Sequence, residues 1–174
     1  SFWWMARSGV NEISDDRLVA DADLPKSILT GRTLSGLDLS GANLRGSVFK
    51  NSRITNVMAR SMFADKSSFE SSQIIGCDFS EAVLRGAQMR SAKFMNSMFT
   101  KTRMDEVILD SANLVQTDIS NSILSGSKLR YARFEETSAT GSDFLKAELT
   151  GSTILNCEVS KANLHKCNFR GVTV

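Results

Sequence analysis

Apolar residues recur at every fifth position over most of the chain. From Leu24 to Val174 all thirty-one residues at this spacing are apolar, and we call them centres. The position two residues before the centre carries Ala, Ser, Thr, Cys or Val in twenty-eight repeats, and Arg32, Leu37 and Met62 are the exceptions. These sixty-two positions hold one charged residue, although a charged fraction of 23% would place about fourteen there. Both positions are therefore expected to face a dry interior.

A period of five matches neither a helix of 3.6 residues per turn nor an alternating strand. It fits a solenoid whose coil is built from five-residue sides. Ten of the eleven glycines, all but Gly9, fall two residues after a centre. A corner at this position needs a residue that tolerates positive φ, so we expect the chain to turn there.

The repeat units resemble those of the pentapeptide-repeat family. Examples are SGANL at residues 40–44, EAVLRG at residues 81–86 and KANL at residues 161–164. The resemblance implies an all-β fold, a right-handed quadrilateral β-helix with four pentapeptides per coil. Thirty-one pentapeptides then form about eight coils, a rod roughly 37 Å long at a sheet spacing of about 4.8 Å. We assign residues 1–21 to an N-terminal cap segment and residues 22–174 to the β-helix.

Charged residues one position after the centres alternate in sign at a spacing of twenty. Residues one coil apart face each other like neighbours in a sheet, where opposite charges stabilise by roughly 0.2–1 kcal/mol per pair. The alternation therefore supports a coil of twenty residues independently of the resemblance, and we interpret it as a solvated ladder rather than a binding site. One column reads Lys50, Glu70, Arg90, Asp110 and Arg130, and the next reads Arg45, Asp65, Arg85 and Asp105.

Two interpretations remain open where the centres Ala59 and Ala64 are small. In the first, the register slips, and Met58 and Phe63 become centres through a bulge that later returns to register. In the second, the register is kept, Met62 fills the space under the two alanines, and Phe63 lies outside.

Both ends of a solenoid expose an apolar cross-section and unpaired strand edges, so each end needs a cover. At the N-terminus, Trp3 and Trp4 are expected either to fold over the first coil or to anchor a partner. Ser14 is expected to open one helical turn. At the other end the repeat continues to Val174, itself a predicted interior position. We expect a partner, a further segment or a second copy to cover that end.

No pattern of catalytic, metal-binding or cofactor-binding residues emerges. His165 is predicted to point outward while Cys167 points inward, so the two do not form a metal pair. Cys77, Cys157 and Cys167 all occupy the small inward position and are predicted to be buried, unreactive thiols without a disulfide. The serines mostly line the interior and lack a general base. We therefore predict a protein that is not an enzyme and has no cofactor.

Composition and charge exclude several other classes of protein. A hydrophobic fraction of 41% with one proline excludes a disordered or collagen-like chain. The net charge of +2 gives no argument for nucleic acid or a membrane surface, and no apolar run approaches the length of a membrane span. A soluble protein is expected. The resembling family includes cytosolic bacterial members, secreted effectors and organelle-lumen members, so the compartment stays unknown.

The strongest functional signal is an outward apolar column at twenty-residue spacing, which we call the apolar stripe. An aligned apolar column on a flat wall is typical of a partner surface, and methionine suits adaptable contacts. The stripe consists of Ile75, Met95, Val115 and Leu155, is interrupted by Glu135, and has Met98 on the adjoining face. A weaker apolar cluster consists of Ile28, Val48, Phe63 and Val83.

We therefore predict a non-catalytic protein-interaction scaffold, or a structural subunit of a larger assembly. It is expected to bind a protein partner through the apolar stripe or the C-terminal coil. The resemblance implies an alternative, because some pentapeptide-repeat proteins mimic DNA, bind type II topoisomerases and protect them from quinolones. That role relies on a strongly acidic surface, which the net charge of +2 and the alternating columns do not favour.

Overall fold

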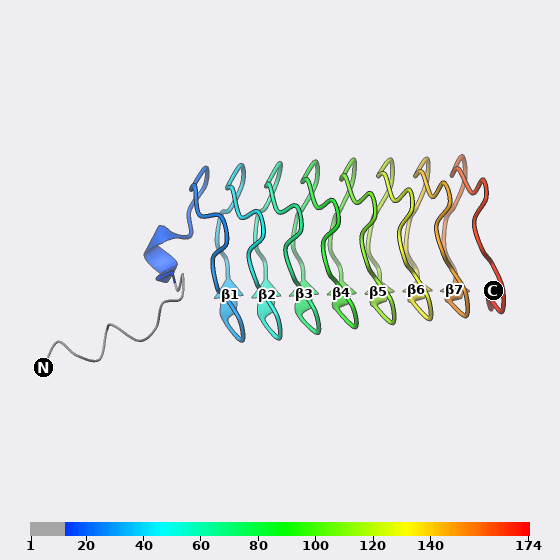
Figure 1. The fold of residues 1–174 in the computed structure, drawn as a ribbon, viewed down its shortest axis with the longest axis horizontal. Helices are drawn as coiled ribbons and strands as arrows, with labels where there is room; N and C mark the ends of the chain where they lie inside the picture. The colour runs from blue at the N-terminus through cyan, green and yellow to red at the C-terminus, as the bar shows by residue number, and fades with distance from the viewer. Residues whose placement is uncertain (1–12) are drawn as a thin grey trace, which may run out of the picture.

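Seven short parallel strands, stacked in chain order along a rod, form the main element of the structure (Figure 1). The structure, a computed structural model, describes residues 13–174. Each strand pairs with the next one twenty residues further on. This all-β solenoid confirms the predicted fold. The strands are β1 (Thr33–Ser35), β2 (Arg53–Thr55), β3 (Gln73–Ile75), β4 (Lys93–Met95), β5 (Asn113–Val115), β6 (Arg133–Glu135) and β7 (Thr153–Leu155).

The other three sides of each coil are held by isolated bridges rather than by strands. Met58 bridges Asp78 and Phe63 bridges Val83, again twenty residues apart. Four columns of pairing therefore run along the rod, and we call the column of β1–β7 the β wall. Six complete turns separate β1 from β7, the Thr153–Thr173 bridge closes one more, and a partial turn precedes β1. The described coils are thus slightly fewer than the predicted eight or so.

The corners between the walls use the left-handed region of the backbone. Described residues two positions after a centre have φ values between +49° and +70°, and ten of these residues are glycine. The others are chiefly Asn, Ser, Lys and Glu. Gly151 also leaves room for the ring of Tyr131, which a Cβ there would approach to 2.6 Å.

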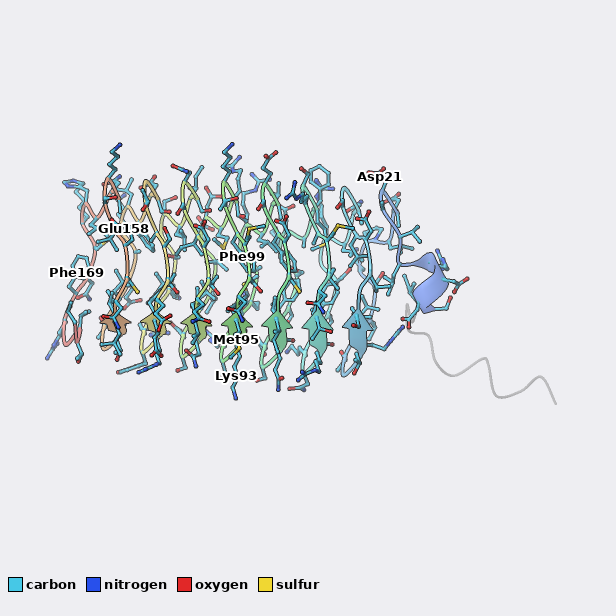
Figure 2. All side chains as sticks on the ribbon, turned by 180° about the vertical axis from the view of Figure 1, so that it is seen from behind. Asp21, Lys93, Met95, Phe99, Glu158 and Phe169 are labelled. Carbon is cyan, nitrogen blue, oxygen red and sulfur yellow. The ribbon has the colours of Figure 1, made fainter. Side chains whose placement is uncertain are left out.

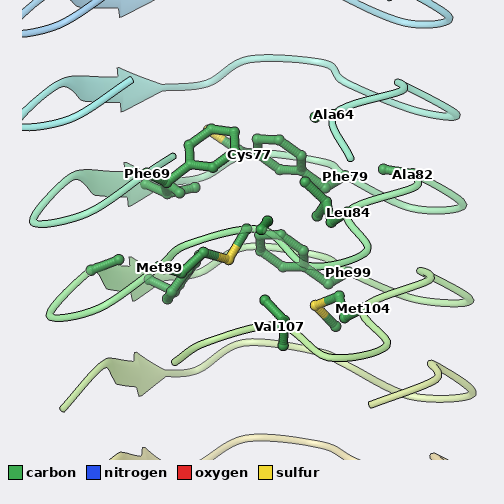
Figure 3. Close-up of a cluster of buried hydrophobic side chains, with 14 of the residues drawn as sticks. Ala64, Phe69, Cys77, Phe79, Ala82, Leu84, Met89, Phe99, Met104 and Val107 are labelled. Atoms are coloured by element: carbon green, nitrogen blue, oxygen red, sulfur yellow. The ribbon is translucent and has the colours of Figure 1, made fainter. Parts of the chain in front are cut away.

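The centres form one buried cluster along the inside of the rod. Phe49 stacks on Phe69 with ring centroids 4.5 Å apart, and Phe79 stacks on Phe99 at 4.9 Å, both nearly parallel. Figure 3 shows Phe69, Phe79 and Phe99 within this cluster. Because each ring lies on its counterpart one coil away, the interior is a continuous stack rather than a set of separate cores.

The small inward residues contribute hydrogen bonds as well as space. Ser52 Oγ donates to the Leu29 carbonyl oxygen at 2.6 Å, and Thr137 Oγ1 donates to the Leu114 carbonyl oxygen at 3.1 Å. Each accepting carbonyl belongs to the preceding coil. The hydroxyls of Ser52 and Thr137 are therefore satisfied within a dry interior, so an inward position can hold Ser or Thr as well as Ala.

The register is kept through the two small centres. Ala59 and Ala64 are fully buried, and Met62 is 1% exposed. Phe63 and Met58 lie outside, 37% and 52% exposed. The bulge interpretation is wrong, because Met62 supplies the interior volume that the alanines lack and the twenty-residue pairing needs no extra residue.

The first charge column forms ion pairs between neighbouring coils. Lys50 Nζ lies 3.1 Å from Glu70 Oε2, and Asp110 lies between Arg90 at 3.8 Å and Arg130 at 2.5 Å. Burial alone would raise the pKa of Asp110. Hydrogen bonds from the side chain and backbone of Arg130, with the charges of both arginines, hold this pKa below its ordinary value. Asp110 is thus an anion at neutral pH that ties three coils together.

The second charge column is ordered in the same way, with one exception. Asp65 lies 3.2 Å from Arg45 Nε and 3.0 Å from Arg85 Nε. Asp105 pairs at 3.3 Å with Arg103 of its own coil. The alternating charges predicted from the sequence are therefore largely neutralised along the surface of the rod.

A short cap covers the N-terminal end of the described coils. The 3-10 helix η1 (Asp15–Arg17) follows Ser14, as predicted, and Ile13 and Leu18 are buried with the core. Arg32 Nη1 donates to the Ile13 carbonyl oxygen at 2.7 Å, and its guanidinium pairs with the first residue of η1. This contact explains the charged exception among the small inward positions.

Candidate functional site

The apolar stripe lies on the β wall. Ile75, Met95 and Val115 occupy the last positions of β3, β4 and β5 and are direct partners in the pairing register. Met95 is 44% exposed, while the other two are half-buried. Glu135 and then Leu155 continue the column on β6 and β7. The structure therefore brings the four predicted stripe residues into one line.

Met98 lies on the adjoining wall, beyond the corner at Asn96, and is 40% exposed. It bridges Asp78 and Asp118, so an acidic residue stands on each side of it. Met58 occupies the same column two coils earlier. Its spacing of forty from Met98 indicates an outward position, which the interpretation of Met58 as an alternative centre does not allow.

A column of cationic and amide side chains runs beside the stripe, and we call it the basic column. Arg53 Nη1 donates to Gln73 Oε1 at 2.8 Å, and Arg133 pairs with Glu135 at 2.7 Å. Lys93, which Figure 2 labels with Met95 on β4, forms no ion pair within residues 13–174. This column, which the apolar periodicity does not predict, consists of Arg53, Gln73, Lys93, Asn113 and Arg133.

The remaining predicted contact residues are more scattered. Trp3 and Trp4 lie outside the described residues. The weaker apolar cluster is divided between two walls, because Ile28 bridges Val48 whereas Phe63 bridges Val83. The cluster is therefore less continuous than the apolar stripe.

The C-terminal end of the described coils exposes interior side chains. Leu164 is 38% exposed and Phe169 is 42% exposed, whereas centres from Leu29 to Leu149 are 5% exposed or less. Within the described residues no further coil packs on this end. A cavity of about 160 Å³ opens there, lined by Phe134, Thr137, Ala139, Phe144, Leu149, Ile154, Cys157, Val159, Leu164, Phe169 and Val174.

The three cysteines differ in exposure. All are free thiols, and burial raises the pKa of each. Cys77 is 2% exposed, but Cys157 and Cys167 are only partly buried. The prediction that all three thiols are buried is therefore wrong for the last two, because they lie in the coil at the open end, while their reactivity stays a prediction.

This difference predicts an order of thiol labelling. In the native protein, timed treatment with iodoacetamide is expected to modify Cys157 and Cys167 before Cys77, because reagent reaches Cys77 only after local opening. Peptide mapping by mass spectrometry measures each rate, and denatured protein provides the control in which the rates converge. Native labelling of Cys77 as fast as Cys167 contradicts the expectation.

The described residues show no arrangement suited to metal chemistry. Within residues 13–174 no group of three or more His, Cys, Asp or Glu side chains could hold a metal ion. His165 is exposed, as predicted, while Cys167 packs against the core. In the same part of the chain, no helix has the length and apolar character needed to cross a membrane.

Family models agree with the coil geometry. The model described as "Pentapeptide repeat region" matches residues 87–164, and the model "Pentapeptide repeats (8 copies)" matches residues 20–51, 29–58 and 66–100. The chain belongs to the pentapeptide-repeat family. No curated protein sequence gives a significant match to this pentapeptide-repeat protein.

Solved structures show the same fold. HetL, a pentapeptide repeat protein involved in heterocyst differentiation regulation from the cyanobacterium Nostoc sp. strain PCC 7120, is 19% identical. Its TM-score is 0.55, with 95% of this chain and 92% of HetL covered. Full-length QnrB1, a plasmid-mediated fluoroquinolone resistance protein, is 17% identical with a TM-score of 0.50, and 94% of this chain and 89% of QnrB1 are covered. At these identities the likeness concerns the fold alone.

Proposed function

We propose that this pentapeptide-repeat protein is a non-catalytic scaffold that binds a protein partner through the apolar stripe. The observation that carries the proposal is the alignment of Ile75, Met95 and Val115 on three adjacent strands. Contiguous exposed apolar surface is typical of interaction sites. The wall is fixed by backbone pairing on both sides, so little conformational entropy is lost on binding.

The C-terminal end and the charge columns also bear on this proposal, the first as a second contact surface and the second as an argument against DNA mimicry. The apolar cavity at the C-terminal end offers a second contact surface for a partner, a further segment or a second copy. A DNA-mimicking role is not favoured, because acidic residues such as Asp65 and Asp110 stand between arginines along their columns.

The proposal is tested by the double variant Met95→Glu with Val115→Glu. Both side chains lie on the outside of the rod, so the coil should remain folded, with a melting temperature within a few degrees of wild type. Capture of the partner from the native source is expected to be lost, because two carboxylates would be buried against an apolar contact. Quantitative affinity capture and circular dichroism measure the two effects.

A matched control places the same charges on other walls. Ile108 and Ile123 are also outward and half-buried, and each bridges a basic residue. The variant Ile108→Glu with Ile123→Glu is expected to capture the partner like wild type. If the stripe variant also captures it unimpaired, the stripe is only part of a β wall and the proposed function fails.

A further inference from the structure

Two chemically different columns lie side by side on the β wall. The stripe and the basic column are two residues apart on the same strands, with a buried centre between them, so both point outward. On β4, Met95 follows Lys93 in this way. Any partner that covers the stripe therefore also meets the basic column.

The basic column carries uncompensated charge over β2–β5. Within residues 13–174, neither Arg53 nor Lys93 has a carboxylate partner. Arg133 is neutralised by Glu135, which also interrupts the stripe, so the surface is bounded at β6. A partner with carboxylates on this flank would be complementary, and basic residues there would be repelled.

The other flank of the surface has the opposite character. Beyond the corner, Met98 stands between Asp78 and Asp118. Arg60 neutralises Asp78, but Asp118 forms no ion pair within residues 13–174 and accepts a hydrogen bond from the Ser120 backbone at 2.8 Å, so the negative charge of this flank comes from Asp118. Acidic groups on the partner are therefore favoured beside Lys93 but not beside Met98, which makes the surface asymmetric.

The distance between neighbouring strands of the β wall favours one backbone conformation of the partner. Neighbouring strands are about 4.8 Å apart, whereas a helix rises about 5.4 Å per turn. Over the two steps from Ile75 to Val115, a helix along the rod drifts out of register by only about 1.2 Å. An extended strand repeats on one face every 6.8 Å or so and drifts by about 4 Å. Strand addition is also blocked, because β2–β6 are paired on both sides.

We propose that the partner presents an amphipathic helix that lies along the rod, with apolar residues on the stripe and acidic residues toward Arg53 and Lys93. This inference rests on the proposed function of the apolar stripe and adds the chemical class of its partner. The two cations are two coils apart, about 9.6 Å, which matches two helical turns of about 10.8 Å. Acidic residues seven positions apart on the partner helix would therefore reach both.

Three synthetic helical peptides of about eighteen residues, five turns, serve as probes. The first has leucines at positions i, i+4, i+7 and i+11 and glutamates on one flank. The second replaces these glutamates by lysines, and the third keeps the glutamates but replaces the leucines by serines. In fluorescence anisotropy, the first peptide is expected to bind more tightly than the other two, and its affinity should fall as salt is added.

Variants then identify the surface. Lys93→Glu is expected to weaken the acidic peptide by about three- to tenfold and to strengthen the lysine peptide. Met95→Glu should abolish binding of both. Lys101→Glu, at an exposed corner of another wall, is the matched control and should leave both affinities unchanged.

Equal binding of the acidic and basic peptides, or no binding of the acidic peptide, would overturn the inference. If the peptides fail while Met95→Glu with Val115→Glu still loses the native partner, the proposed function stands and the helix class is wrong. If that variant retains the native partner, both proposals fail together.

Discussion

Replacing Leu114 by aspartate is expected to unfold the coil stack or to prevent expression. Leu114 is the centre of β5, is 3% exposed, and pairs with Phe94 and Phe134 in the neighbouring coils. A carboxylate there has no partner and no water, and its burial costs several kcal/mol. Because each coil contacts only its neighbours, unfolding of the coil that contains Leu114 also breaks the packing between the coils on either side of it. Circular dichroism and soluble yield measure the loss.

Two variants separate burial of charge from other effects. Gln73→Glu adds a carboxylate at an exposed outward position of β3, where Arg53 already donates to the side chain, and is expected to leave the melting temperature nearly unchanged. Leu114→Ala removes volume without charge, and should lower the free energy of unfolding by about 2–5 kcal/mol. Soluble Leu114→Asp protein with the wild-type melting temperature would contradict the inward assignment of the centres.

The five-residue period predicts whether a side chain points into or out of the coil. It does not predict whether a neighbouring coil then buries that side chain. It places Cys77 and Cys167 at equivalent inward positions, yet Cys77 is buried and Cys167 is partly exposed. The difference depends on whether another coil packs above the residue, which no local pattern encodes. Arg32 shows the same effect at the other end, where an inward position in the first coil faces the cap instead of another coil.

The candidate site was predictable in part for a related reason. The stripe could be found because Ile75, Met95 and Val115 share an apolar character that repeats every twenty residues. The basic column mixes Arg, Gln, Lys and Asn, so its residues look unrelated until the pairing register places Arg53 and Lys93 on one wall. Its significance also depends on the lack of carboxylate partners for Arg53 and Lys93 within residues 13–174, which follows from side-chain geometry rather than from spacing.

Around the small centres Ala59 and Ala64, two registers agree with the sequence, because the side chain that fills the interior of the coil can come from more than one position. The wall pairing favours a regular ladder, and a bulge would leave the backbone groups of one residue unpaired. The Met58 and Phe63 bridges keep that ladder intact while a large side chain enters from the small inward position. The interior volume of the coil is therefore kept because a small residue at the centre is offset by a large residue, Met62, at the position two before it.

Met62→Ala is accordingly expected to lower the free energy of unfolding by about 2–5 kcal/mol. Met62 is 1% exposed, and its neighbours Ala59 and Ala64 have no side-chain length with which to fill the space. The cavity should therefore remain open, placing the cost in the upper part of that range. Chemical denaturation measures the change, and Met58→Ala is the control, since Met58 is 52% exposed and its truncation should cost little.

A second substitution tests whether volume exchange is the cause. Ala64→Leu alone should destabilise by about 1–3 kcal/mol, because Met62 already occupies the space. Combined with Met62→Ala, the same change should restore stability, since leucine then returns the centre to the pattern of the other coils. The double variant is thus expected to be more stable than Met62→Ala alone, with a favourable coupling between the two sites. Additive losses would mean that the side chains do not share one cavity, and that the coil keeps its register for another reason.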